Sequence, residues 1–172
     1  MSPPANRDSL FRSWLEEHQG ILVSVTSSFA ESAADLADLR QDVLLQLWLS
    51  TTSFDLRCKP STWIYRVCLN TAFAWKRKHR RREQARTDSV DVTELPAPSD
   101  TTADRDLLER LYAAIRQLPE FDRALVLLML DDASYRDIAE ITGITENHVG
   151  VALTRARKRL AALMKGVVDE LE

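Results

Sequence analysis

Residues 135–160 read YRDIAEITGITENHVGVALTRARKRL. Ala139 is small where two helices would cross closely, Gly143 follows where a tight turn favours glycine, and Val149 returns to the core six residues later. This spacing is typical of a helix-turn-helix, whose second helix we expect to begin near Glu146. The remaining positions that the pattern predicts to be buried, or nearly so, are Ile138, Ile144, Val151 and Leu153.

The exposed side of the second helix carries side chains suited to nucleic acid. Residues 147–168 contain five basic and no acidic side chains. Amide, imidazole, hydroxyl and guanidinium groups are the types that contact base edges and phosphates. The alternative, a helical hairpin whose basic face is merely solvated, leaves the joint spacing of the alanine, the glycine and the valine unexplained. The residues predicted to contact DNA are Asn147, His148, Gly150, Thr154, Arg155, Arg157 and Lys158, with Arg159 beside them.

The rest of the chain is also patterned for helices. Only 4 glycines and 6 prolines occur in 172 residues, and apolar residues recur at helical spacing in three segments before residue 86. Ser32 and Asp35 have the spacing of a capping box, and Ser61 is placed to cap a third helix. Residues 87–103, TDSVDVTELPAPSDTTA, have no apolar periodicity. We therefore predict an all-α protein of two small helical domains, residues 1–86 and 104–172, joined by a flexible acidic linker, residues 87–103.

The charge distribution predicts two contacts with DNA and a larger partner. The formal net charge is −3, yet residues 59–86 carry nine basic side chains and one acidic side chain. Phosphate neutralisation supplies most non-specific DNA affinity, so an acidic chain with two basic segments should bind DNA poorly alone. Aromatic rings precede the first basic tract, at Trp63 and Trp75, and rings of this kind either stack on unpaired bases or pack in the core.

Three motifs in this order resemble the extracytoplasmic-function (ECF) sigma factors of bacterial RNA polymerase. Residues 35–43, DLADLRQDV, with Leu47 and Trp48, look like the family's polymerase-docking helix. Residues 61–72, STWIYRVCLNTA, look like the helix that reads the minus-ten element and helps to open it. Residues 135–160 are similar to the region that reads the minus-thirty-five element, and the resemblance covers roughly residues 10–163.

The resemblance implies residues for each role. The docking residues would be Asp35, Asp38, Gln41 and Asp42. The residues at the minus-ten element would be Trp63, Arg66, Asn70, Thr71, Lys76, Arg77 and Arg80. The partners would be core RNA polymerase and promoter DNA, both as duplex and as the melted non-template strand, with an anti-sigma factor as a further candidate.

Two other functions are weighed against this one. An autonomous helix-turn-helix regulator accounts for residues 135–160 equally well but leaves residues 63–82 unexplained. An enzyme is disfavoured because His18, His79 and His148 are scattered and no phosphate-binding loop, nucleophile elbow or metal-spaced pair occurs. We expect no catalytic residue, metal or cofactor. The two cysteines should be reduced thiols, and the absence of a long apolar run predicts a cytoplasmic protein.

Overall fold

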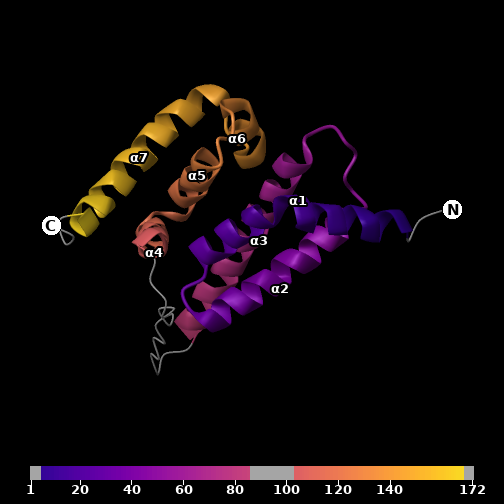
Figure 1. Ribbon diagram of the computed structural model, residues 1–172, viewed down its shortest axis with the longest axis horizontal. Helices are drawn as coiled ribbons and strands as arrows, with labels where there is room; N and C mark the ends of the chain where they lie inside the picture. The colour runs from indigo at the N-terminus through magenta and orange to yellow at the C-terminus, as the bar shows by residue number, and fades with distance from the viewer. Residues whose placement is uncertain (1–4, 86–102, 169–172) are drawn as a thin grey trace. The chain divides into compact units, whose positions relative to one another are not determined.

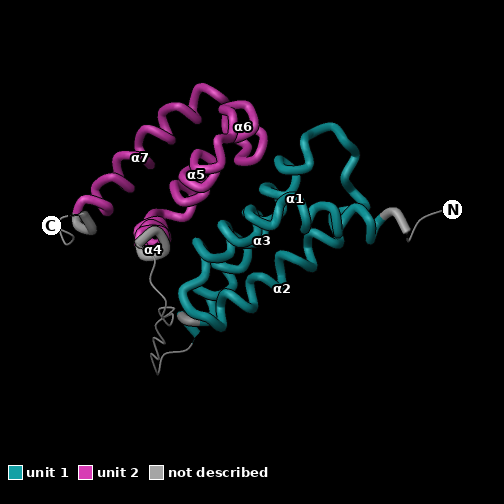
Figure 2. The backbone as a smooth tube through the Cα atoms, in the orientation of Figure 1, with its two compact units in different colours: residues 1–94 teal, residues 95–172 magenta. Residues whose placement is uncertain are grey.

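The computed structural model describes residues 5–85 and 103–168, and in these residues it contains seven helices and no strand (Figure 1). The chain divides into two compact units, residues 1–94 and 95–172 (Figure 2). The predicted all-α class with two helical domains is confirmed. The predicted linker, residues 87–103, lies outside the described residues except for Ala103, which begins a helix.

Unit 1 is a bundle of three helices, α1 (Ala5–Phe29), α2 (Ala33–Ser50) and α3 (Pro60–Ala85). All three helices pack against one another, and each buries the apolar face that its 3.6-residue periodicity predicts. Phe29 meets Phe73 edge to face, with ring centroids 5.6 Å apart. The core residues with almost no exposed surface include Trp14, Val25 and Phe29 of α1, Leu39, Val43 and Leu47 of α2, and Ile64, Cys68 and Ala72 of α3.

The ends of these helices follow local rules, with one correction. The Ser32 side chain accepts a hydrogen bond from the Asp35 amide at 3.1 Å, so the predicted cap of α2 is confirmed. Ser61 does not cap α3, because the helix already begins at Pro60, whose fixed φ suits a first helical position. Within α1, His18 leaves helical geometry at φ −127° and ψ 19°, so the helix is kinked there.

Unit 2 is built around α5 (Glu120–Leu130), an apolar helix whose residues 124–128 are all buried. The helices α4 (Ala103–Gln117) and α7 (Glu146–Val168) both pack on α5, and α6 (Tyr135–Thr142) packs on α7. The Arg123 guanidinium donates to the carbonyl oxygens of Arg116 and Leu118, which closes the end of α4. Leu107 and Leu108, near the start of α4, are both about half exposed.

The helices α6 and α7 form the predicted helix-turn-helix. Gly143 ends α6 in the left-handed region at φ 76°, and its amide donates to the Ala139 carbonyl at 2.9 Å. The second helix begins at Glu146, and Val149 is fully buried, both as predicted. Val151 is the exception, because its side chain is 72% exposed instead of buried. No helix in the described residues is both long enough and apolar enough to cross a membrane.

Candidate DNA and polymerase interfaces

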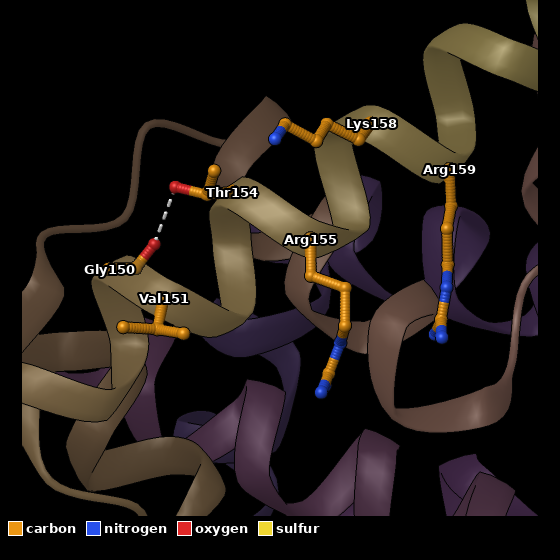
Figure 3. A pocket seen from close by; sticks show the side chains of 6 residues that line it. All are labelled: Gly150, Val151, Thr154, Arg155, Lys158 and Arg159. Atoms are coloured by element: carbon orange, nitrogen blue, oxygen red, sulfur yellow. Dashed lines mark hydrogen bonds between the residues drawn. The ribbon is translucent and has the colours of Figure 1, made fainter.

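The first candidate site is the outer face of α7 in unit 2. Figure 3 shows its central part, where three pairs of adjacent residues, repeated every four positions, line an open surface pocket. Arg155 and Arg159 extend in one direction, while Thr154 and Lys158 extend in another (Figure 3). The residues that line this pocket are Gly150, Val151, Thr154, Arg155, Lys158 and Arg159.

A buried carboxylate holds two of these arginines. Asp122, in the first turn of α5, is only 1% exposed, and its Oδ1 accepts a hydrogen bond from Nη2 of Arg155 at 3.2 Å. Its other oxygen is paired with the Arg159 guanidinium. Both arginine side chains remain about half exposed, at 54% and 48%. Because a guanidinium has five N–H donors, Arg155 keeps donors for a second partner while Asp122 fixes its direction.

Three other predicted residues of α7 make contacts with the same helix, with the residue just before it, or with α5. Thr154 donates its hydroxyl to the Gly150 carbonyl at 2.8 Å, and His148 lies 3.1 Å from the Thr145 hydroxyl through Nδ1. Arg157 leans on α5, with Nε 2.8 Å from the Met129 sulfur. Asn147, His148 and Lys158 are exposed. The side chains held by these contacts have fewer conformations open to them, which lowers the entropy cost of binding in a groove.

The second candidate site lies between α2 and α3 of unit 1. The predicted docking residues Asp38, Gln41 and Asp42 are exposed and line one side of a groove of about 280 Å³. Basic and aromatic side chains of α3 line the other side, and they are Trp75, Lys78, His79 and Arg82. The predicted docking residues and part of the predicted basic tract therefore share one surface.

A second groove, of about 450 Å³, adjoins the first and shares Asp42, Trp75 and Lys78 with it. Asn70 and Thr71, both predicted to read the minus-ten element, line this groove. The structure thus brings Asn70 and Thr71 of α3 next to Asp42, one of the predicted docking residues of α2. The fourth predicted docking residue, Asp35, lies in the first turn of α2. Nε2 of His79 lies 3.9 Å from its Oδ1, and the His79 ring stacks on Trp75 with centroids 4.8 Å apart.

Two predicted residues of the basic segment are engaged inside unit 1. Lys76 is only 7% exposed, and its ammonium is paired with the Glu31 carboxylate at the junction of α1 and α2. Trp63 is half-buried, and its indole nitrogen donates to the Ser50 hydroxyl at 3.2 Å. Its ring packs at 5.7 Å on Phe54. Arg66 is half-buried, whereas Arg77 and Arg80 are exposed.

Sequence reasoning missed Asp122 and Val151. Acidic residues are common in the first turn of a helix, where they interact favourably with the helix dipole. Nothing in the sequence therefore distinguishes Asp122 as a partner for arginines of α7. The exposure of Val151 could have been predicted, because residues 149 and 151 are about 200° apart on a helix and cannot share a buried face.

The described residues do not form a cluster of three or more metal-ligating side chains. Cys58 and Cys68 are not joined in a disulfide. Burial raises the pKa of the Cys68 thiol, which therefore stays protonated.

Comparison with known families assigns the two units. Residues 14–82 match the Sigma-70 region 2 family, and residues 108–160 match the Sigma-70 region 4 family. The matches fall one in each unit, in that order along the chain. A three-helix unit followed by a helix-turn-helix unit, with these two matches, defines a sigma factor.

Individual relatives show which group of sigma factors the chain resembles. The chain is 26% identical over 165 residues to the ECF RNA polymerase sigma factor SigM of Bacillus subtilis, covering 95% of this chain and 98% of the relative. It is 30% identical over 138 residues to the ECF sigma factor EcfG of Rhodopseudomonas palustris, covering 80% and 75%. Its fold matches the sigma factor RpoE of Bartonella quintana, solved with the anti-sigma factor NepR, at a TM-score of 0.72 and 25% identity, covering 90% of this chain and 96% of that one. The chain belongs to the ECF sigma factor family, and it is a sigma subunit that directs transcription initiation.

Proposed function

We propose that the two units of this sigma subunit recognise two promoter elements by different physical routes. In this proposal α7 reads the minus-thirty-five element as intact duplex, and α3 engages the minus-ten element as it opens. The observation that carries the proposal is the outer face of α7, which is free of acidic side chains after Glu146 and is braced on α5 through Asp122. A rigid cationic helix of this kind suits a major groove.

Docking on core RNA polymerase is assigned to the α2 side of unit 1. Asp38, Gln41 and Asp42 are exposed and lie along one groove, where they offer two carboxylates and an amide to a basic partner surface. Asp35 belongs to the same helix, where its backbone amide donates to the Ser32 hydroxyl and its carboxylate faces His79.

Contact with the downstream element is assigned to four residues of α3. Asn70 and Thr71 line the groove beside the docking edge, and an amide and a hydroxyl there can bond to an unpaired base. Arg77 and Arg80 are exposed and can follow the phosphate backbone. Lys76 and Trp63 take supporting roles in this proposal, because their polar atoms already bind Glu31 and Ser50.

The proposal extends to regulation and location. Because RpoE, which this chain resembles in fold, was solved with the anti-sigma factor NepR, we assign an anti-sigma protein as a partner here also. The protein acts by binding and not by catalysis, and it works in the cytoplasm, where transcription takes place.

Transcription in vitro tests this division of roles. The chain, mixed with bacterial core polymerase, should start transcripts from promoter fragments recovered by its association in cells, and neither component should do so alone. Changing Asn70 and Thr71 to alanine should impair initiation, and a template melted in advance at the minus-ten element should restore the part lost in strand opening. An autonomous regulator would instead shift duplex DNA without core polymerase, and that result would contradict the proposal.

A further inference from the structure

An apolar side chain stands in the middle of the cationic face of α7. Val151 is 72% exposed, the largest exposed fraction among the exposed large hydrophobic residues in the described part of unit 2. A β-branched residue gains nothing for the helix at such a site, because it is a weaker helix former than alanine and leaves apolar surface in water. A partner that covered Val151 would remove this apolar surface from water.

The geometry of the helix places Val151 close to the centre of the outer face. The buried residues Val149, Ala152, Leu153 and Ala156 define the inner face of α7. At about 100° per residue, Val151 points within about 30° of the direction opposite to that face. Arg155 lies about 70° from the same direction, on the flank that Asp122 holds. Asn147 and Lys158 lie closer still to that direction, so Val151 belongs to the central row of side chains that would face a groove.

The surroundings of Val151 select the kind of partner. Around it the outer face carries Asn147, Thr154, Arg155 and Lys158, and no acidic residue occurs from residue 147 to residue 168. A surface that docks an apolar protein patch is poor in charge at its centre, whereas this one is cationic on several sides. The pattern favours a polyanion that also offers a small apolar group.

We propose that Val151 contacts the C5 methyl group of a thymine in the upstream promoter element and so determines sequence preference there. This inference rests on the proposed role of α7 as the reader of that element. Valine has neither donor nor acceptor, and the thymine methyl is the apolar group that base pairs display in the major groove. Val151 and Arg155 are one turn apart, about 6 Å along the helix, so the thymine should lie one or two base pairs from the base that Arg155 contacts.

Substituting deoxyuridine for thymine provides the test, because it removes only the methyl group. An upstream element is first selected from a random duplex library with the complete polymerase holoenzyme, and each of its thymines is then replaced singly. One replacement should weaken binding of the wild-type holoenzyme about fourfold, which corresponds to about 0.8 kcal/mol for one methyl group. The holoenzyme with Val151→Ala should bind the thymine and deoxyuridine duplexes equally. Val23→Ala, the same change at an exposed site of α1, should keep the wild-type response.

Each other outcome counts against the inference. The inference would be overturned if replacing each thymine with deoxyuridine changed the binding of the wild-type and Val151→Ala holoenzymes by the same factor. Loss of association with core polymerase in Val151→Ala would also overturn it and would identify a protein as the partner of Val151. If the holoenzyme selects no upstream element, or if Asn147→Ala leaves its preference unchanged, the proposed function of α7 itself fails, and that result is distinct from the first two.

Discussion

Replacing Asp122 with alanine should loosen α7 from α5. The change removes the hydrogen bond to Arg155 at 3.2 Å and the ion pair to Arg159. Hydrogen bonds to charged groups contribute about 1.5–3 kcal/mol each, or about 3–6 kcal/mol for two. Because both guanidinium groups are about half exposed, water should compensate about half of that loss. We therefore expect unit 2 to lose about 1.5–3 kcal/mol of stability.

Amide hydrogen exchange measures this loss locally. At about 1.4 kcal/mol for each factor of ten, exchange in the protected parts of α5 and α7 should become about 10- to 140-fold faster. Peptides from α2 provide an internal control, and Asp131→Ala, at an exposed site that ends α5, should change exchange little. If the amides of α5 and α7 exchange at the same rate in the Asp122→Ala and Asp131→Ala variants, the Asp122 carboxylate does not brace α7 and the reasoning is refuted.

Three further predictions concern other parts of the chain. Changing Asp38 and Asp42 together to lysine should abolish co-purification with core polymerase while leaving helical circular dichroism unchanged; retained association would exclude this edge of α2. Native Cys68 should resist alkylation at neutral pH because its thiol is buried and protonated, and rapid labelling, read by mass spectrometry against Cys58, would contradict the placement. Gly143→Ala should cost about 1 kcal/mol in chemical unfolding, since φ is 76° there, and an unchanged midpoint would argue against the left-handed turn.

Features with a local cause were predictable from the sequence. Gly143 marks the turn because the left-handed conformation favours glycine, and Ser32 marks the start of α2 because its hydroxyl can reach the Asp35 amide. The buried stripes of unit 1 followed from helical periodicity alone. Val151 was misplaced because its apolar character was given more weight than its angle from Val149.

Features that depend on distant residues were not predictable in this way. Lys76 is 45 residues from Glu31 in sequence, and Asp122 is 33 residues from Arg155. Such pairs form only after the helices have packed, so a basic tract or a lone acid gives no sign of them. The sharing of one groove by Asp42 and Lys78 likewise depends on how α2 lies against α3.

The most direct test of separate recognition is a promoter library in which both elements are randomised, selected with holoenzymes that carry single substitutions. Arg155→Ala and Asn147→Ala should alter the upstream consensus, by about 1–3 kcal/mol per lost base contact, and leave the downstream consensus as in the wild type. Asn70→Ala should alter the downstream consensus and leave the upstream consensus as in the wild type. If Arg155→Ala shifts the downstream consensus, or Asn70→Ala shifts the upstream one, the two units do not read separate elements.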